Sequence, residues 1–194
     1  MASRNEIDRS ADRVRGRAYG CLFFIGFGSA WIFSGLAATH HMTRVLAVVA
    51  GVVCAALLVA TLLLLRRAKD LPAASLDSED AQRATRMFRA VNIIQWVSIG
   101  TAIVILQMVH MPQYVVPAIA IIVGLHLFPL AGSFHNRQHY VTGWLLILWS
   151  LGCLALLPAD RVAGIAALGT GVVLLVSAAV MLWRNLGAGL RVRV

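Results

Sequence analysis

The chain has few charged residues, and very few of them are acidic. Asp, Glu, Lys and Arg make up 13% of its 194 residues, whereas ordinary globular domains carry about 25%. Hydrophobic residues make up 60%, and so few charges cannot cover that much apolar material in water. These proportions exclude a soluble globular domain and an intrinsically disordered chain.

Cysteines, carboxylates and common enzyme motifs are also scarce or absent. The three cysteines have no Cys-x-x-Cys spacing, which excludes a disulfide scaffold and argues against a zinc site. No Walker, Gly-x-Ser-x-Gly or His-Glu-x-x-His pattern occurs, so the usual signals of nucleotide binding and hydrolysis are missing. None of the eight Asp and Glu residues lies deep in an apolar run. We therefore expect no enzyme, and no carboxylate-based ion-coupling site.

What the chain has instead is a series of long apolar segments. Each is about 18–23 residues long and crosses about 30 Å of hydrocarbon as an α-helix. Apolar residues occupy all faces, which predicts helices rather than barrel strands. The expected spans are 19–38, 45–65, 91–110, 113–131, 141–158 and 161–183. The predicted fold is an all-α, polytopic transmembrane bundle of six helices, with a basic N-terminus over 1–18, a loop over 66–90 and a basic tail over 184–194.

Basic residues are distributed very unevenly among the predicted loops. The formal net charge is +9, and 15 of the 17 Lys and Arg residues fall on the side of the two termini; only Arg44 and Arg161 fall on the other. Since Lys and Arg remain in cytoplasmic segments, we predict an N-in/C-in protein of a bacterial cytoplasmic (inner) membrane, with no nucleic-acid partner. A cleaved signal peptide is the alternative for the first run, which is longer than a typical signal core.

The longest loop is basic and ends in an amphipathic pattern. Its arginines are Arg66, Arg67, Arg83, Arg86 and Arg89. Apolar residues at positions 84, 87, 88 and 91 follow helical spacing, which predicts a helix lying on anionic lipid headgroups. The alternative is a docking surface for a soluble partner protein, and the chain would then be a non-transporting sensor or scaffold.

Small residues recur at helical spacing in three of the spans. Helices in lipid associate through close packing, which small residues permit. The glycines that we expect at such contacts are Gly28, Gly35, Gly51 and Gly171, so the first, second and sixth spans are the predicted tight neighbours. A homodimer seam is the alternative use of these faces.

One group of polar residues falls within the spans near the predicted cytoplasmic side. It comprises His126, Gln95, Asn92, Ser177 and Pro129. Pro129 has no N–H group, so the Leu125 carbonyl beside His126 loses its helical partner. An interrupted helix with a titratable ring is typical of a solute or proton site. The alternative is a structural hydrogen bond between His126 and Gln95.

Histidine and methionine gather in the two outer turns. The residues are His40, His41, Met42, Met108, His110 and Met111. Imidazole and thioether ligands suit copper, and imidazole alone suits zinc, so transition-metal binding is one hypothesis. A second one is a two-histidine site at His135 and His139 in the short inner loop, where a solvated polar loop is the competing interpretation.

The run 124–131, Gly-Leu-His-Leu-Phe-Pro-Leu-Ala, followed by Tyr-Val-Thr-Gly at 140–143, resembles a fourth-helix pattern in small bacterial inner-membrane proteins of unassigned function. The resemblance implies a six-helix inner-membrane protein and no particular activity. From the residues themselves, the leading functional hypothesis is a permease or exporter for a small solute or ion, with His126 in its inner polar layer.

Overall fold

The chain forms an all-α bundle of six long helices. The computed structural model describes residues 11–40, 43–69, 79–134 and 137–190. The long helices are α2 (Ala11–Ala38), α3 (Arg44–Arg67), α4 (Glu79–Met108), α5 (Val115–Phe134), α6 (Arg137–Leu156) and α7 (Ala159–Leu190), and a short 3-10 helix, η1 (Pro112–Tyr114), precedes α5. The predicted fold class is therefore confirmed. α2 and α6 begin before the apolar runs that predicted them, since each starts with a polar turn.

All six long helices are long and apolar enough to cross a membrane. α7 is the most buried of them, and α3 and α4 are the least buried. On these two outer helices, large apolar side chains such as Val52, Leu63 and Val97 are exposed. Apolar surface of this extent requires an apolar surrounding. The architecture is that of a multi-pass membrane protein.

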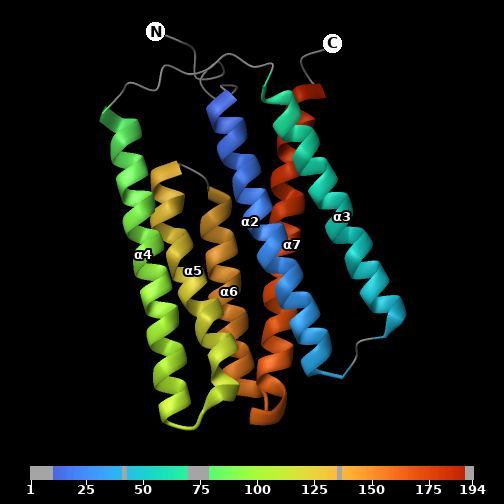
Figure 1. Cartoon of the computed structure of the whole chain (residues 1–194), viewed down its shortest axis with the longest axis vertical. Coiled ribbons are helices and arrows are strands. Elements are labelled where there is room, and N and C mark those ends of the chain that lie inside the picture. The colour runs from blue at the N-terminus through green and yellow to red at the C-terminus, as the bar shows by residue number, and fades with distance from the viewer. Residues whose placement is uncertain (1–10, 41–42, 70–78, 135–136, 191–194) are drawn as a thin grey trace.

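Figure 1 shows α7 beside α2, with α5 and α6 on one side of this pair and α3 on the other. α7 packs extensively against α2 and also contacts α3, α5 and α6, while α4 packs mainly against α5 and η1. α4 and α3 lie at opposite edges of the bundle (Figure 1). The start of α2 and the end of α7 lie at one end of the bundle, with exposed Arg15, Arg66, Arg137 and Arg184. We call this the basic end, and the opposite one the turn end.

The tightest helix contact is between α2 and α7, and glycines form it. A Cβ atom added to Gly35 would lie 2.7 Å from Leu168 Cγ and 2.9 Å from the Gly164 carbonyl oxygen. A Cβ added to Gly171 would lie 2.8 Å from the Gly28 carbonyl oxygen. The two backbones therefore approach closely where the sequence places Gly28, Gly35 and Gly171.

Gly51 on α3 behaves differently. A Cβ atom added there would meet nothing within 4 Å, so Gly51 makes no tight contact within the described chain. The expectation of close packing at this position is thus not met. Gly51 is half-buried and lies one turn before Cys54, which Ser29 of α2 contacts, but no neighbouring helix approaches closely enough to touch a side chain at this position. A close contact that the sequence analysis did not predict joins Gly124 on α5 to Gly143 on α6, where an added Cβ would lie 2.7–2.8 Å from the opposite carbonyl oxygen.

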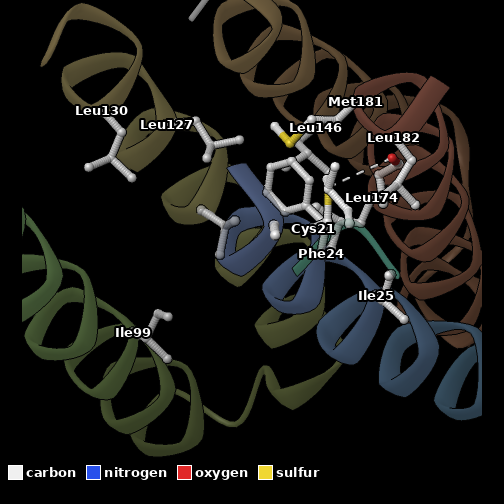
Figure 2. Packing of buried hydrophobic residues seen from close by; sticks show 14 residues of the cluster. Cys21, Phe24, Ile25, Ile99, Leu127, Leu130, Leu146, Leu174, Met181 and Leu182 are labelled. Carbon is white, nitrogen blue, oxygen red and sulfur yellow. Dashed lines mark hydrogen bonds between the residues drawn. The ribbon is translucent and has the colours of Figure 1, made fainter. Parts of the chain in front are cut away.

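The main hydrophobic core lies between α2, α5, α6 and α7. Figure 2 shows Phe24 and Cys21 of α2 among Leu146 of α6 and Met181 of α7. Ile99 of α4 stands apart from this group in Figure 2, although it is buried. α4 is therefore attached to the edge of the core rather than built into it.

Candidate functional site

Polar side chains gather inside the half of the bundle that lies toward the basic end. We define this inner cluster as Gln95 on α4, His126 on α5, His139 and Thr142 on α6, and Ser177 on α7. Gln95, His126, Thr142 and Ser177 are all buried, with at most 9% of their surface exposed. Four helices thus contribute hydrogen-bonding groups to one interior region, which is otherwise lined by hydrocarbon.

His126 joins the cluster to α4 through its backbone. Its ring is hydrogen-bonded to the backbone of Val91, while its other ring nitrogen, Nδ1, is buried and has no hydrogen-bond partner. Gln95 lies one turn further along α4, and its Oε1 atom is also buried without a partner. The proposed structural bond between these side chains does not form through either of these two atoms. Asn92, on the same helix, is only half-buried.

The first turn of α6 supplies the second half of the cluster. The His139 ring meets the Phe24 ring edge-on, with 5.8 Å between their centroids, and it lies near His126. Gln138 Nε2 donates to the Ser177 carbonyl at 2.5 Å. The Thr142 and Ser177 hydroxyls are hydrogen-bonded at 2.8 Å. These bonds fix the α6–α7 register at the level of the two imidazoles.

His139, Gln138 and Thr142 were not predicted as members of the polar layer. The apolar run that predicts this span starts at residue 141 and places His139 in a loop, whereas α6 begins at Arg137. Residues 139, 142 and 146 lie on one face of α6. The helical spacing of His139 from the buried positions 142 and 146 is the sequence signal that would have placed it in the polar layer. His135, the other histidine of the proposed pair, lies outside the described residues.

The α5 helix is not interrupted at Pro129, contrary to expectation. Pro129 lies inside a helix that continues to Phe134. Gly124, which flanks His126, packs closely against the backbone of Gly143. The inner cluster is therefore built on continuous helices. The polar atoms that it offers for hydrogen bonding belong to side chains and not to an interrupted backbone.

The outer histidines do not come together. His40 follows α2 and His110 follows α4, and Figure 1 shows these turns on opposite sides of the bundle. Both residues have positive φ, 56° and 57°, a conformation in which histidine is enriched. The His110 and Met111 N–H groups bond back to the carbonyls of Gln107 and Leu106, as in a Schellman helix cap. Capping therefore accounts for His110.

Metal binding at the turn end has little geometric support. His41 and Met42 lie outside the described residues. Among the residues that the structure describes, no group of three or more His, Cys, Asp or Glu is placed to hold a metal ion. Met108 and Met111 are exposed next to His110. The other described turn, which holds His40, does not bring a second histidine to them.

The arginines expected at lipid headgroups lie around the basic end. Arg66 and Arg67 end α3, and Arg86 and Arg89 lie on the early turns of α4, all with exposed side chains. Arg83 also lies in α4. Arg66 and Arg67 on α3 and Arg86 and Arg89 on α4 thus place exposed basic side chains at the basic end of both outer helices.

Comparison with known proteins adds no relative. No family model, no curated protein and no solved structure matches the chain. The resemblance of the 124–131 run to small inner-membrane proteins thus remains a prediction, and the function has to be argued from the site alone.

Proposed function

We propose that this chain is a small permease of a cytoplasmic membrane and that the inner cluster binds its solute. The observation that carries the proposal is the pair of buried atoms without partners, His126 Nδ1 and Gln95 Oε1. A buried polar atom that makes no hydrogen bond costs about 1–3 kcal/mol. A chain that only had to fold could place apolar residues at both positions. A bound polar solute, or the water that it displaces, would satisfy both atoms.

The chemistry of the cluster favours a neutral solute. Its side chains are imidazole, amide and hydroxyl groups, which donate and accept hydrogen bonds without a fixed charge. Among the described residues, no Asp, Glu, Lys or Arg side chain is fully buried. An ion would therefore lose its hydration with no opposite charge to replace it, which is costly in a membrane interior. We infer a small molecule with hydroxyl or amide groups.

The weak attachment of α4 supports a route to the cluster. On this helix only Gln95 and Ile99 are buried among the described side chains, and its main contacts are with α5 and η1. Elements with few buried apolar contacts open at low free-energy cost. A movement of α4 away from α5 would expose Gln95 and His126 together.

The exposed arginines at the basic end support an orientation with this end in the cytoplasm. Lys and Arg are retained on that side, and each contributes about 1 kcal/mol of attraction to anionic lipid near the surface. We propose that Arg66, Arg67, Arg86 and Arg89 bind anionic headgroups and hold the start of α4 at the interface.

The test is solute flux in vesicles that contain the purified protein. Glycerol and urea serve as neutral probes, and potassium and chloride as ionic ones. We expect protein-dependent flux of at least one neutral probe, and no protein-dependent flux of either ion. His126→Leu keeps a similar volume but removes both nitrogens, and it should reduce the neutral flux at least tenfold per folded molecule.

His110→Asn is the matched control for His126→Leu. It removes an imidazole far from the cluster and keeps a residue that tolerates positive φ, so flux should remain unchanged. If His126→Leu lowers the melting temperature of the protein but leaves flux per folded molecule intact, His126 is structural and the proposal fails. It fails equally if no neutral probe crosses faster than in protein-free vesicles.

A further inference from the structure

Two buried serine and threonine hydroxyl groups in the bundle lack the hydrogen bond that other hydroxyls in these helices make. Serine and threonine in helices commonly donate to the carbonyl four residues earlier. Three examples here are Ser29 to Ile25 at 2.6 Å, Thr61 to Leu57 at 2.8 Å and Thr142 to Gln138 at 3.0 Å. Ser150 on α6 and Thr170 on α7 are 0% and 1% exposed, yet neither hydroxyl has a hydrogen-bond partner.

The helix register places these two hydroxyls at the same level. α6 and α7 are antiparallel, and the Thr142–Ser177 bond of 2.8 Å fixes their alignment. Ser150 lies eight residues further along α6, and Thr170 lies seven residues back along α7. Both steps span about 10–12 Å along the axis, so the two residues lie at the same level. Seven residues are almost two full turns, so Thr170 shares the face of Ser177 on α7. Eight residues overshoot two turns by about 80°, so Ser150 lies about a quarter turn around α6 from Thr142, still on the buried side of that helix. The contact of Trp149 with Gly169 confirms that the helices are still adjacent there.

Apolar side chains separate this pair from the inner cluster. Leu146 and Leu174 lie between the two levels, one on each helix, and are 0% and 1% exposed. Toward the turn end, Cys153 and Val162 belong to a second apolar cluster. Ser150 and Thr170 are thus the polar groups of an otherwise apolar stretch of the α6–α7 interface.

We propose that Ser150 and Thr170 form a second binding site, which holds one water-sized neutral molecule between the two helices. The two residues lie at the same level of the interface, and neither hydroxyl has a hydrogen-bond partner. One bridging water would give each of them a partner. In lipid no other solvent reaches these groups. If the proposed permease function holds, Ser150 and Thr170 form a second binding site on the solute path. The Leu146–Leu174 layer is then the barrier between this site and the inner cluster.

The hydroxyl pair has too few groups to hold an ion or a metal. Two hydroxyls offer two donors and up to four lone pairs, and none carries a charge. Water is the occupant in the absence of solute, and a hydroxyl or amide group of a passing molecule fits the same partners. The existence of the site does not depend on transport, so it is tested separately.

The test is a double-mutant cycle on thermal stability in lipid nanodiscs, with Ser150→Ala, Thr170→Val and both together. If a water bridges the hydroxyls, each single substitution removes one end of the bridge and should lower the melting temperature by about 2–4 °C. The double substitution removes both ends and should be no worse than the more harmful single one. The effects are therefore strongly non-additive.

Thr61→Val is the control, because this buried hydroxyl already bonds to its own helix and lies on α3. Its effect should add to that of Ser150→Ala. Thr170→Ser retains the hydroxyl and should preserve the coupling to Ser150, even if the lost methyl group lowers stability. If the effects of Ser150→Ala and Thr170→Val are additive, the proposed site is wrong. This holds if both substitutions raise the melting temperature, as expected for two isolated hydroxyls without partners, and also if both lower it.

Discussion

Exchanging a single hydrogen for a methyl group at two glycines tests the packing of the bundle directly. In Gly35→Ala the new methyl group would lie 2.7 Å from Leu168 Cγ, 2.8 Å from the Leu168 nitrogen and 2.9 Å from the Gly164 oxygen. Two of these three atoms belong to the α7 backbone, so α2 and α7 must move apart. In Gly51→Ala the methyl group meets nothing within 4 Å.

The expected effects differ in sign. Overpacking of a tight contact costs about 1–3 kcal/mol, so Gly35→Ala should destabilise the protein. Alanine in place of glycine in an exposed helix gains up to about 1 kcal/mol, so Gly51→Ala should be neutral or stabilising. The two variants should then differ by about 1–4 kcal/mol, which corresponds to roughly 2–16 °C in melting temperature for a chain of this size.

The assay is thermal unfolding of both variants in the same detergent or nanodisc, followed by intrinsic tryptophan fluorescence. Equal melting temperatures of the two variants would contradict this prediction, since they would mean that α2 and α7 are not in close contact at Gly35. A large loss in Gly51→Ala would show instead that α3 is packed against something, and a second copy of the chain would be the first candidate to examine.

Three further substitutions bear on the interior. Thr142→Val removes the 2.8 Å bond to Ser177 and should lower stability by about 0.6–2 kcal/mol, measured by unfolding in mixed micelles. Gln95→Leu removes a buried oxygen without a partner, so it should leave the melting temperature unchanged or raised while neutral-solute flux falls; retained flux would exclude Gln95 from the site. Leu146→Ala should increase flux, because it makes the Leu146–Leu174 barrier thinner. Leu64→Ala, which opens a similar space on α3, should leave flux unchanged. Equal flux in the two variants would contradict the proposal that Leu146 is part of a barrier.

The sequence was sufficient for the fold because lipid imposes simple rules. Every backbone polar group in hydrocarbon must be satisfied within its own segment, so six apolar runs predict six helices. Glycine spacing predicted the α2–α7 contact at Gly28 and Gly171. The same spacing failed at Gly51, because a small-residue stripe marks a face that can pack closely and does not say whether another helix covers it.

The candidate site was only partly predictable. His126, Gln95 and Ser177 stood out as polar residues within apolar runs, and all three are buried on inner faces. His139 was missed because hydropathy does not register the polar first turn of α6, where the helix begins four residues before the apolar run. Pro129 was overinterpreted, since a helix continues through a proline when its surroundings hold the backbone in place.

The direct measurement of the central claim is chemical access to the inner cluster from the basic end. Gln95→Cys is made in a chain whose native cysteines, Cys21, Cys54 and Cys153, are replaced by alanine, and a membrane-impermeant thiol reagent is added to vesicles of either orientation. The account predicts that Cys at this position is labelled from the basic end, and that a permeating neutral solute slows the labelling. Labelling from neither side, or only from the turn end, would contradict it.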